Sequence, residues 1–507
     1  MPKFQKIIHA LATLFFIAML CFFSSCQYDV FSSDPNLRLS FSTDTINFGL
    51  SITTVPSSTR RVVVHNRNNN ALRISEIGLA GGANSPFRMN VNGRTSENNR
   101  FSNIEISARD SMFIFVNVRV ESLGQDLPFF IEDHIFFNTN GNMQQVVLET
   151  YGQDVEFLNA LTFQNDSTLT AARPYVIFGN MIVPAELTLT LEPGTRLFFH
   201  NNANLIVWGN LIAEGTAEKP IEMRGDRFDS RQSGILFPFP VPYNFIAGQW
   251  GGVYLLGNGT HRMKHVNMNS GQVGIFLSAD AQHIPSLEQM PSLELSNSRI
   301  HNFLLYGLVA QDANLIVANT EISNSGSYTV FLNGGSHTFV HTTIANFFNV
   351  GMSIQTRSRN STHPAVMIEN MNRTAPMQTV FLNSVIAGSA TTEFSLATRF
   401  PAEFDGIFRN TYIKRSPLEF PQFSDIRWYE RNDTVFRSAA LNLRLNEYFN
   451  FEPDSVSPLL QLADPAISFA TEFERFNLRF DLNGNDRTES ERPAAGAFEW
   501  RAAIKDE

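Results

Sequence analysis

The sequence is poor in cysteine, with 2 among its 507 residues. Cys21 lies inside an N-terminal apolar run and Cys26 follows it, so removal of that run leaves Cys26 alone. A mature chain with one cysteine has no internal disulfide, which excludes the disulfide-stapled folds of many small exported domains. The fold must then rest on its core, and 46 phenylalanines with 43% hydrophobic residues allow large cores.

Helical periodicity is nearly absent after residue 30. Short stretches of alternating apolar and polar residues are interrupted by Asn, Gly and Ser, which is the pattern of strands and turns. We therefore expect an all-β chain, whose length allows about two to four domains.

An excess of basic residues is also missing, since 38 Lys and Arg stand against 48 Asp and Glu. Removing residues 1–25 removes Lys3 and Lys6 and no acidic residue, which leaves 36 basic against 48 acidic residues, a net charge of −12. Such a surface does not suit nucleic acid or the face of an anionic bilayer. We expect no nucleic-acid partner.

Residues 1–26 indicate export. Two lysines precede the apolar run 7–23, as in a secretion signal, although the run is also near the lower length limit for a membrane-spanning anchor. The motif Phe23-Ser24-Ser25-Cys26 resembles the lipobox of bacterial lipoproteins, a family that prefers Leu in place of Phe23. The resemblance implies a signal peptide over 1–25 and lipid on Cys26. It also implies a lipid-anchored place on the outer membrane, at the cell surface or on the periplasmic face.

Residues 26–38 are polar and Ser-rich and predict a tether, whereas residues 39–155 carry about seven short strand signals and predict a two-sheet sandwich. Three segments, 44–49, 85–87 and 152–154, resemble the immunoglobulin-like domains common in bacterial surface proteins. The resemblance implies a fold and says almost nothing about function, and we expect a spacer rather than a ligand-binding domain.

Residues 156–425 contain an internal repeat. Ile300, Ile322 and Ile344 are each 22 residues apart. The local pattern Asn/His-x-x-Ile/Met begins at His265, Asn297, Asn319, His341, Asn383 and Asn410. A period of 22 with apolar alternation predicts the coils of a parallel β-solenoid. Ile and Met columns would fill its interior, and Asn columns would stack at its bends, where each amide bonds the next.

Three segments near the start of this region, 187–197, 204–216 and 249–253, resemble the right-handed parallel β-helix repeat proteins of bacterial surfaces. The resemblance implies a right-handed parallel β-helix over 156–425, but the members of these families differ widely in function. Residues 426–507 look like the C-terminal segment that closes such helices. A cap is physically required, because an open end exposes the core and unpaired strand edges.

The tail contains one pattern with metal-ligand spacing. Asp481, Asn483 and Asn485 alternate like the start of a calcium loop, but Arg492 stands at the twelfth position, where such a loop has Glu. We therefore expect no metal and no cofactor.

Catalytic groups are sparse along the regular repeats. Lyases of this shape need acidic calcium ligands and a base, and hydrolases need two or three carboxylates on neighbouring coils. Acidic residues between Trp250 and Ser416 are scattered. Arg299 and Glu321 share a column and predict a surface ion pair. His301, beside the inward-facing Ile300, should face outward as a surface residue.

The insertion 225–250 is the best candidate for ligand binding. Its prolines keep it out of the strand ladder, and aromatic rings on a stiff loop suit stacking against sugar rings or a protein partner. We favour the alternative, in which the loop folds over the side of the helix and buries its rings. The candidate binding residues are Phe237, Phe239, Tyr243, Phe245 and Trp250. Asp226, Arg227 and Asp229 are the catalytic candidates if the protein is an enzyme, and otherwise form an ion pair that closes the loop.

A further pattern concerns modification. Asp-Ser/Thr followed by an apolar residue recurs and resembles the O-glycosylation sequon of one Gram-negative phylum, although Asp-Ser/Thr also favours turns. The resemblance implies glycans on Thr45, Ser111, Thr434 and Ser455.

These features favour a non-enzymatic surface lipoprotein that presents a parallel β-helix to a glycan or a protein partner. One alternative is a polysaccharide lyase or glycoside hydrolase that acts on the side of the helix. The other is a structural subunit of a surface assembly.

Overall fold

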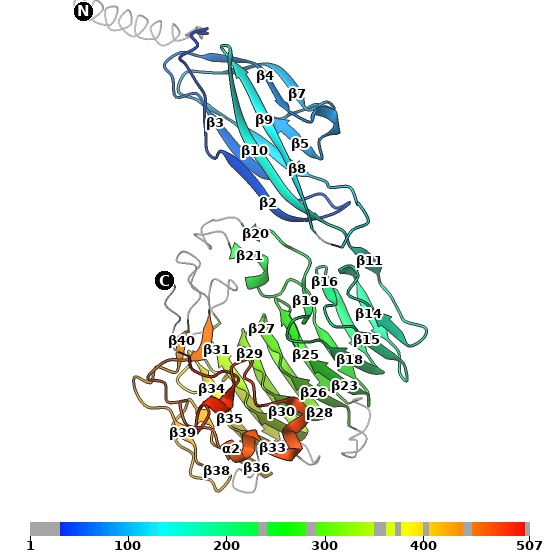
Figure 1. Ribbon diagram of the computed structural model, residues 1–507, viewed down its shortest axis with the longest axis vertical. Coiled ribbons are helices and arrows are strands. Elements are labelled where there is room, and N and C mark those ends of the chain that lie inside the picture. The colour runs from blue at the N-terminus through cyan, green and yellow to red at the C-terminus, as the bar shows by residue number, and fades with distance from the viewer. Residues whose placement is uncertain are drawn as a thin grey trace, which may run out of the picture. The chain divides into compact units, whose positions relative to one another are not determined.

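The computed structural model describes residues 31–126, 128–231, 241–279, 290–348, 361–370, 377–398, 405–439 and 449–501. Within these ranges the chain is built from strands, and no helix exceeds the 6 residues of η5 (Thr471–Phe476) (Figure 1). The expected all-β class is therefore confirmed. The chain divides into two compact units, residues 1–153 and 154–507. None of the described helices is long and apolar enough to cross a membrane, and the apolar run 7–23 lies outside the described residues.

The first unit consists of two sheets that share one apolar core. One sheet has the order β1 (Ser40–Phe41), β3 (Arg60–His65), β8 (Ser111–Val118), β5 (Phe87–Val91), β6 (Arg94–Thr95). The other has the order β2 (Thr45–Ile52), β10 (Asn142–Gln153), β9 (Phe129–Thr139), β4 (Leu72–Leu79), β7 (Arg100–Ile106). Neighbours are antiparallel except β2 and β10, which run parallel. The alternation seen in the sequence sends every second residue into the core, as in β8, where Ile114 and Val116 are buried.

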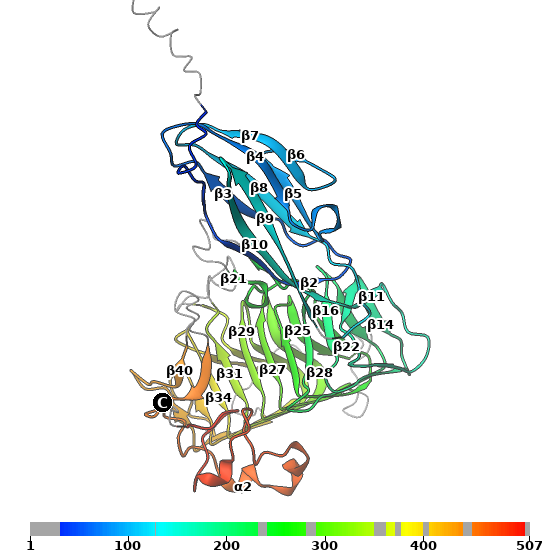
Figure 2. The same ribbon diagram turned by 45° about the horizontal axis from the view of Figure 1, so that its top comes forward.

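The second unit is dominated by two large parallel sheets. The smaller one, called here the floor sheet, contains β11 (Glu156–Asn159), β13 (Tyr175–Phe178), β16 (Arg196–Phe199), β19 (Ile221–Gly225), β24 (Val266–Asn269), β27 (Arg299–Phe303), β29 (Glu321–Ser325), β31 (Thr343–Asn346), β34 (Val385–Gly388), β37 (Tyr412–Ile413) and β39 (Arg427–Trp428). Its neighbours β27, β29 and β31 lie side by side in Figures 1 and 2.

The larger parallel sheet branches at its long strands. Its main path contains β12 (Ser167–Leu169), β15 (Thr188–Leu191), β18 (Asn210–Glu214), β23 (Thr260–Lys264), β26 (Ser292–Ser296), β28 (Tyr306–Ala318), β25 (Val273–Ser278), β22 (Val253–Leu256), β17 (Asn204–Val207) and β14 (Asn180–Val183). The branch contains β30 (Val330–Val340), β32 (Val366–Asn370), β33 (Met377–Leu382), β35 (Phe394–Thr398), β36 (Asp405–Arg409) and β38 (Phe423–Ser424). Both sheets line one continuous apolar core.

The 22-residue repeat sets the register of the floor sheet. Ile300 pairs with Ile322, and Ile322 pairs with Ile344, and all three side chains are fully buried. The column continues to Met268 on one side and Ile386 on the other. The predicted interior column is confirmed, because a constant offset between parallel strands puts the same position of each repeat in the same environment.

The predicted asparagine column lies at a bend, as expected, but backbone conformation adds a second reason for it. Six residues, called here the bend column, all have φ between 46° and 51°. They are His265, Asn297, Asn319, His341, Asn383 and Asn410. Asparagine tolerates this left-handed conformation better than most residues. The expected amide ladder is present where Asn319 Nδ2 donates to Asn297 Oδ1 at 2.8 Å.

Residues 426–507 were expected to cap the end of the stack, and only the start of this range lies there. Trp428 fills the far end of the core together with Phe408 and Phe423, and the last two are stacked at 4.5 Å between ring centroids. Residues 449–501, called here the C-terminal segment, run along the side of the stack instead, with contacts from Glu294 of β26 to Arg409 of β36 (Figures 1 and 2). The reason is that the bend column and the outer face of the floor sheet offer the segment both polar and apolar partners.

Short elements complete the second unit. The pair β20 (Ser230–Arg231) and β21 (Val241–Pro242) and the turn η2 (Tyr243–Phe245) belong to the insertion. Further along the chain are β40 (Phe436–Ser438), β41 (Asn450–Pro453), α2 (Pro465–Ser468) and η6 (Arg487–Glu489). In the first unit, η1 (Gly82–Asn84) lies between β4 and β5.

Candidate functional site

A groove of about 510 Å³ opens between the outer face of the floor sheet and the C-terminal segment. Strands β27 and β29 form its floor with Arg299, His301, Glu321, Ser323 and Asn324. The C-terminal segment forms its wall with Phe449, Asn450, Phe451, Glu452, Asn483 and Phe498. Phe245 of η2 completes the lining, so three separate parts of the chain meet here.

The floor follows from strand alternation. Because Ile300 and Ile322 point into the core, Arg299 and His301 point outward, as the sequence predicted. Parallel register then places Arg299 beside Glu321 and His301 beside Ser323. Four side chains of two adjacent strands therefore form one polar surface.

The charges on the floor are paired. Arg299 Nε lies 3.6 Å from Glu321 Oε2, and Ser323 Oγ donates to Glu321 Oε1 at 2.7 Å. The predicted pair between repeats is therefore confirmed, but the expectation that it lies on the surface is wrong for Glu321, which is only 8% exposed. This carboxylate lies on the floor of the groove whose wall is the C-terminal segment, and Arg299 also donates to Asn483 Oδ1 of that segment.

The second carboxylate of the groove, Glu452, is paired as well. Its Oε2 lies 3.3 Å from Nε of Arg437, and its Oε1 accepts a hydrogen bond from Asn483 Nδ2 at 2.8 Å. Each acidic residue of the lining thus has its own guanidinium partner. Arg437 lies outside the lining, so the lining itself has one guanidinium and two carboxylates.

His301 differs from its charged neighbours, because its ring has no hydrogen-bond partner among the residues that the structure describes. Burial lowers the pKa of His301; Glu321 opposes the shift and Arg299 adds to it. The imidazole is therefore neutral at pH 7, with one nitrogen that donates and one that accepts.

Aromatic rings supply the apolar part of the lining. Phe449 and Phe451 are stacked with ring centroids 5.8 Å apart, and Phe451 stacks in turn on Phe347 at 6.1 Å. The Arg299 guanidinium lies 5.7 Å from the ring centroid of Phe498. A surface of rings beside a surface of polar groups suits ligands that have one apolar and one polar side.

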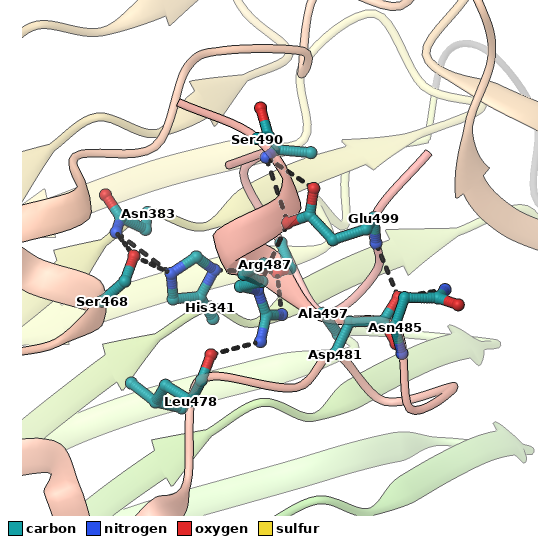
Figure 3. Close-up of polar contacts among 12 residues, drawn as sticks. His341, Asn383, Ser468, Leu478, Asp481, Asn485, Arg487, Ser490, Ala497 and Glu499 are labelled. Atoms are coloured by element: carbon teal, nitrogen blue, oxygen red, sulfur yellow. Dashed lines mark hydrogen bonds and ion pairs between the residues drawn. The ribbon is translucent and has the colours of Figure 1, made fainter. Parts of the chain in front are cut away.

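The wall is held in place by a buried polar cluster around Arg487 (Figure 3). Arg487 is fully buried and donates to the carbonyl oxygens of Leu478 and Phe480 at 2.9 and 2.8 Å. It also donates to Asn319 Oδ1 of the bend column at 2.9 Å. Its Nε lies 3.3 Å from Glu499 Oε1, and burial raises the pKa of Glu499 to about 7, although Arg487 opposes the shift.

A second contact of the wall uses His341 of the bend column (Figure 3). Its Nε2 lies 2.7 Å from Ser468 Oγ, and its Nδ1 lies 3.1 Å from the carbonyl oxygen of Gly496. Gly496 has φ 97°, and a Cβ there would stand 2.6 Å from Thr343 Oγ1. Only glycine allows this close approach. The hydrogen bonds of His341 therefore hold the C-terminal segment in the position where it forms the wall of the groove.

The described part of the insertion agrees with the favoured interpretation, in which the rings of the loop are buried rather than held out for a ligand. Trp250 was expected to contact a ligand, but it is fully buried, stacks on Phe199 at 4.4 Å and donates from Nε1 to the carbonyl of Asn269. Its indole packs in the core because the strand that follows it belongs to the parallel sheet. Tyr243 and Phe245 are partly buried against Val241 and Ile246, and of the two only Phe245 lines the groove. Phe237 and Phe239 lie outside the described residues.

The catalytic candidates of the insertion lie outside the groove lining. Arg227 pairs with both oxygens of Asp229 at 2.9 and 2.6 Å, and this bonding raises the pKa of Arg227. Its guanidinium lies 3.9 Å from the ring centroid of Tyr243. The expected pair with Asp229 is therefore present, but Asp226 bonds His200 Nδ1 at 2.7 Å instead of closing the loop.

The tail loop at Asp481 uses its carboxylate for its own backbone. Asp481 accepts four hydrogen bonds of 2.7–2.8 Å, from the backbone N–H of Asn483, Asn485 and Glu499 and from Asn485 Nδ2. Such a carboxylate has little capacity left for calcium. No group of three or more His, Cys, Asp or Glu suited to a metal occurs among the described residues.

The four expected modification positions are all at least partly accessible. Thr434 and Ser455 are exposed, and Thr45 and Ser111 are half-buried. Ser455 Oγ donates to Asp454 Oδ1 at 2.9 Å, and this bond lowers the pKa of the Asp454 carboxyl. Cys26 lies outside the described residues.

The wall residues of the groove were missed by the sequence analysis. Phe449, Phe451, Asn483 and Phe498 belong to no repeat, and Asn483 was considered only as part of a calcium loop. A signal that could have directed attention to the tail is its density of aromatic residues, which pack against the outer face of the floor sheet.

Comparisons with known proteins give little. No protein-family profile matches the chain. A segment of 111 residues, 21% of this chain, is 32% identical to Protein bark beetle of Drosophila melanogaster, and the match spans 3% of that protein. Among solved structures, a family 123 glycoside hydrolase from Clostridium perfringens is similar over 24% of this chain and 31% of that chain, with 8% identity and a TM-score of 0.17. The ASH/PapD-like domain 7 of human CEP192 is similar over 26% of this chain and 94% of that chain, with 9% identity and a TM-score of 0.16. At these TM-scores neither likeness assigns a fold or a function.

Proposed function

We propose that this protein is an exported surface lipoprotein that binds carbohydrate in the groove without cleaving it. In this proposal, lipid on Cys26 anchors the chain to the outer membrane and residues 26–38 act as a tether. An immunoglobulin-like sandwich over 39–155 is a spacer, and a right-handed parallel β-helix over 156–425 carries the binding site.

The observation that carries the proposal is the composition of the groove. A sugar ring has an apolar face of C–H groups and an edge of hydroxyls, and it is recognised by an aromatic ring together with a few fixed polar groups. The groove offers Phe449 and Phe245 beside His301, and amide nitrogens of Asn324 and Asn450 that have no hydrogen-bond partner in the described part of the chain.

Two features support the fold assignments within this proposal. The floor sheet keeps one register from repeat to repeat, which is what a β-helix requires. The first unit packs two five-stranded sheets over one core, as a sandwich does.

Paired carboxylates argue for binding rather than cleavage. A glycosidase needs one carboxyl that donates a proton and a second, free carboxylate that acts as base or nucleophile. In the groove, Glu321 and Glu452 are each held by an arginine. The rival proposal is polysaccharide cleavage by these two residues with His301, which are the acidic and basic groups available there.

The test is a glycan array, with product analysis, on the detergent-solubilised full chain. We expect binding without products, and at least about ten-fold weaker binding after Phe449→Ala, because stacking is lost. Phe130→Ala is the matched control, since Phe130 is an exposed ring (51%) in the first unit. Product formation would overturn the non-enzymatic function.

The anchor is tested separately. Growth with labelled palmitate should label the wild-type chain and leave Cys26→Ser unlabelled. Equal labelling of both would refute lipid attachment at Cys26, and an unlabelled wild type would favour the uncleaved signal anchor.

A further inference from the structure

The proposed carbohydrate function says nothing about which sugars bind, and the following inference rests on it. We propose that the groove selects uncharged sugars, and that His301 is the residue that forms hydrogen bonds with their hydroxyl groups. Three features support this selectivity, namely the charges of the lining, the state of His301 and the position of the rings.

The charges of the lining leave no site for an acidic sugar. Recognition of a carboxylate needs a guanidinium or ammonium group whose hydrogen bonds are free. Arg299 is the only cationic side chain of arginine or lysine among the described lining residues, and it already binds Glu321, Asn483 and the ring of Phe498. A uronic acid placed beside Glu321 and Glu452 would meet two like charges.

His301 is the open polar group of the floor. It lies between Asn269 and Ser323 in the outward column, and no described residue forms a hydrogen bond with its ring. The charged groups that line the groove with it are Arg299 on β27, Glu321 on β29 and Glu452 on β41. A neutral imidazole donates one hydrogen bond and accepts another, which matches two neighbouring hydroxyls of one sugar.

The rings fix how the sugar lies. Phe449 and Phe451 stand on the wall, whereas His301 stands on the floor. A pyranose with its C–H face on the wall therefore turns its hydroxyl edge toward the floor. The polar groups of the floor therefore decide that uncharged sugars are selected, and the aromatic rings of the wall supply most of the binding affinity.

The experiment is calorimetric titration of the solubilised full chain with two sets of probes. The neutral set contains gluco-, xylo-, manno- and galacto-oligosaccharides, and the acidic set contains galacturonate and mannuronate oligomers. We expect the wild type to bind at least one neutral probe and to bind every acidic probe at least about ten-fold more weakly.

Two variants locate the selectivity. His301→Ala should weaken neutral binding about ten-fold, and His301→Gln should restore part of it, because an amide also donates and accepts. Glu321→Gln should strengthen binding of the acidic probes, because it frees the cation of Arg299. His65→Ala and Glu105→Gln in the first unit are the matched controls and should change neither set.

A pH series adds a readout that a purely structural role of His301 would not produce. Neutral-sugar binding should stay constant from pH 8 toward pH 6 and weaken at lower pH, because protonation turns the acceptor nitrogen into a donor. His301→Gln should abolish this dependence.

The outcomes separate the two levels of the proposal. Equal or tighter binding of acidic probes, or unchanged neutral binding in both His301 variants, would overturn the inference while carbohydrate binding stands. Binding of neither set would overturn the proposed function, and the inference with it.

Discussion

The two units of this protein fix their strand pairing in different ways. In the second unit each strand of the floor sheet pairs with its equivalent in the next repeat, and the same residue types recur at the same places. In the first unit strands pair in a non-repeating order, such as β2 with β10. A repeated environment therefore produces a periodic sequence from which strand register can be predicted, whereas a sandwich produces only alternation of apolar and polar residues.

The units also differ in what they bury. The second unit fully buries Arg487, His261 and His337, whereas in the first unit no described arginine or histidine is buried. Buried polar groups are costly when they lose a partner or gain a charge. The stability of the second unit should therefore be more sensitive to substitution and to pH than that of the first.

The largest effect is expected for Arg487→Met. This change leaves Glu499 buried without its cation and removes the donors that serve Leu478, Phe480 and Asn319. We expect a loss of about 3–5 kcal/mol in the free energy of unfolding of the second unit. Denaturant titration, followed separately for the two units, is the measurement. A loss below about 1 kcal/mol would show that the cluster does not hold the wall.

Acid should weaken the second unit through its buried histidines. His261 lies between Leu211 and Leu293 of neighbouring strands, both of its nitrogens lack partners among the described residues, and burial lowers its pKa from 6.5 to about 4. The unfolded chain therefore binds the proton more readily. Stability should be fully present above pH 6.5 and fall as the pH drops toward 4, by at most about 3 kcal/mol.

His261→Leu tests this effect. The variant should have a shallower loss of stability between pH 6.5 and pH 4 than the wild type. His337, whose pKa burial lowers to about 3, should preserve part of the dependence. Urea midpoints of the second unit at several pH values are the measurement, and parallel curves for variant and wild type would contradict the assignment.

The bend column should show a smaller, backbone effect. Asn410 has φ 51° and no side-chain hydrogen bond in the described structure, so Asn410→Gly should change stability little. Asn410→Ala should cost about 1 kcal/mol, because alanine resists the left-handed region. Asn319→Gly should cost more than Asn410→Gly, since Asn319 also bonds Asn297 and Arg487. Thermal unfolding of the three variants decides the order.

The smallest effect is expected in the first unit, for Arg73→Met. Arg73 and Glu105 form a 2.8 Å ion pair, but their side chains are 50% and 52% exposed. We expect a change of about 0.5 kcal/mol or less, which salt should remove. A loss comparable to that of Arg487→Met would refute the contrast between the units.

The parts of the fold that could be predicted are those that repeat. The Ile300 column and the asparagines of the bend column were predicted from a spacing of 22 residues, because equivalent positions of successive repeats have the same environment. The outward direction of His301 followed from alternation alone. The left-handed backbone conformation at the bend was not predicted. Recurring asparagine could have indicated it, because asparagine adopts that conformation more readily than most residues.

The parts that could not be predicted join segments that are distant in sequence and do not repeat. Arg487 meets Asn319 across 168 residues, and Arg299 meets Asn483 across 184. No periodicity links such pairs, so the residues that form the wall of the groove could not be predicted. For the same reason Glu321 was expected on the surface. Trp250 was misplaced for a related reason, because only packing decided that its ring stacks inside on Phe199.

The all-β class, the register of the repeated strands and the residues that point inward could be predicted from the amino-acid sequence, because alternation and a constant period recur at every strand. The folded structure was needed to show that the C-terminal segment lies along the stack, that Glu321 is buried and that His301 shares a groove with the rings of Phe449 and Phe451. These features depend on contacts between segments that do not repeat. The free energy of such contacts comes from complementary shape and burial, which a pattern along the sequence does not show.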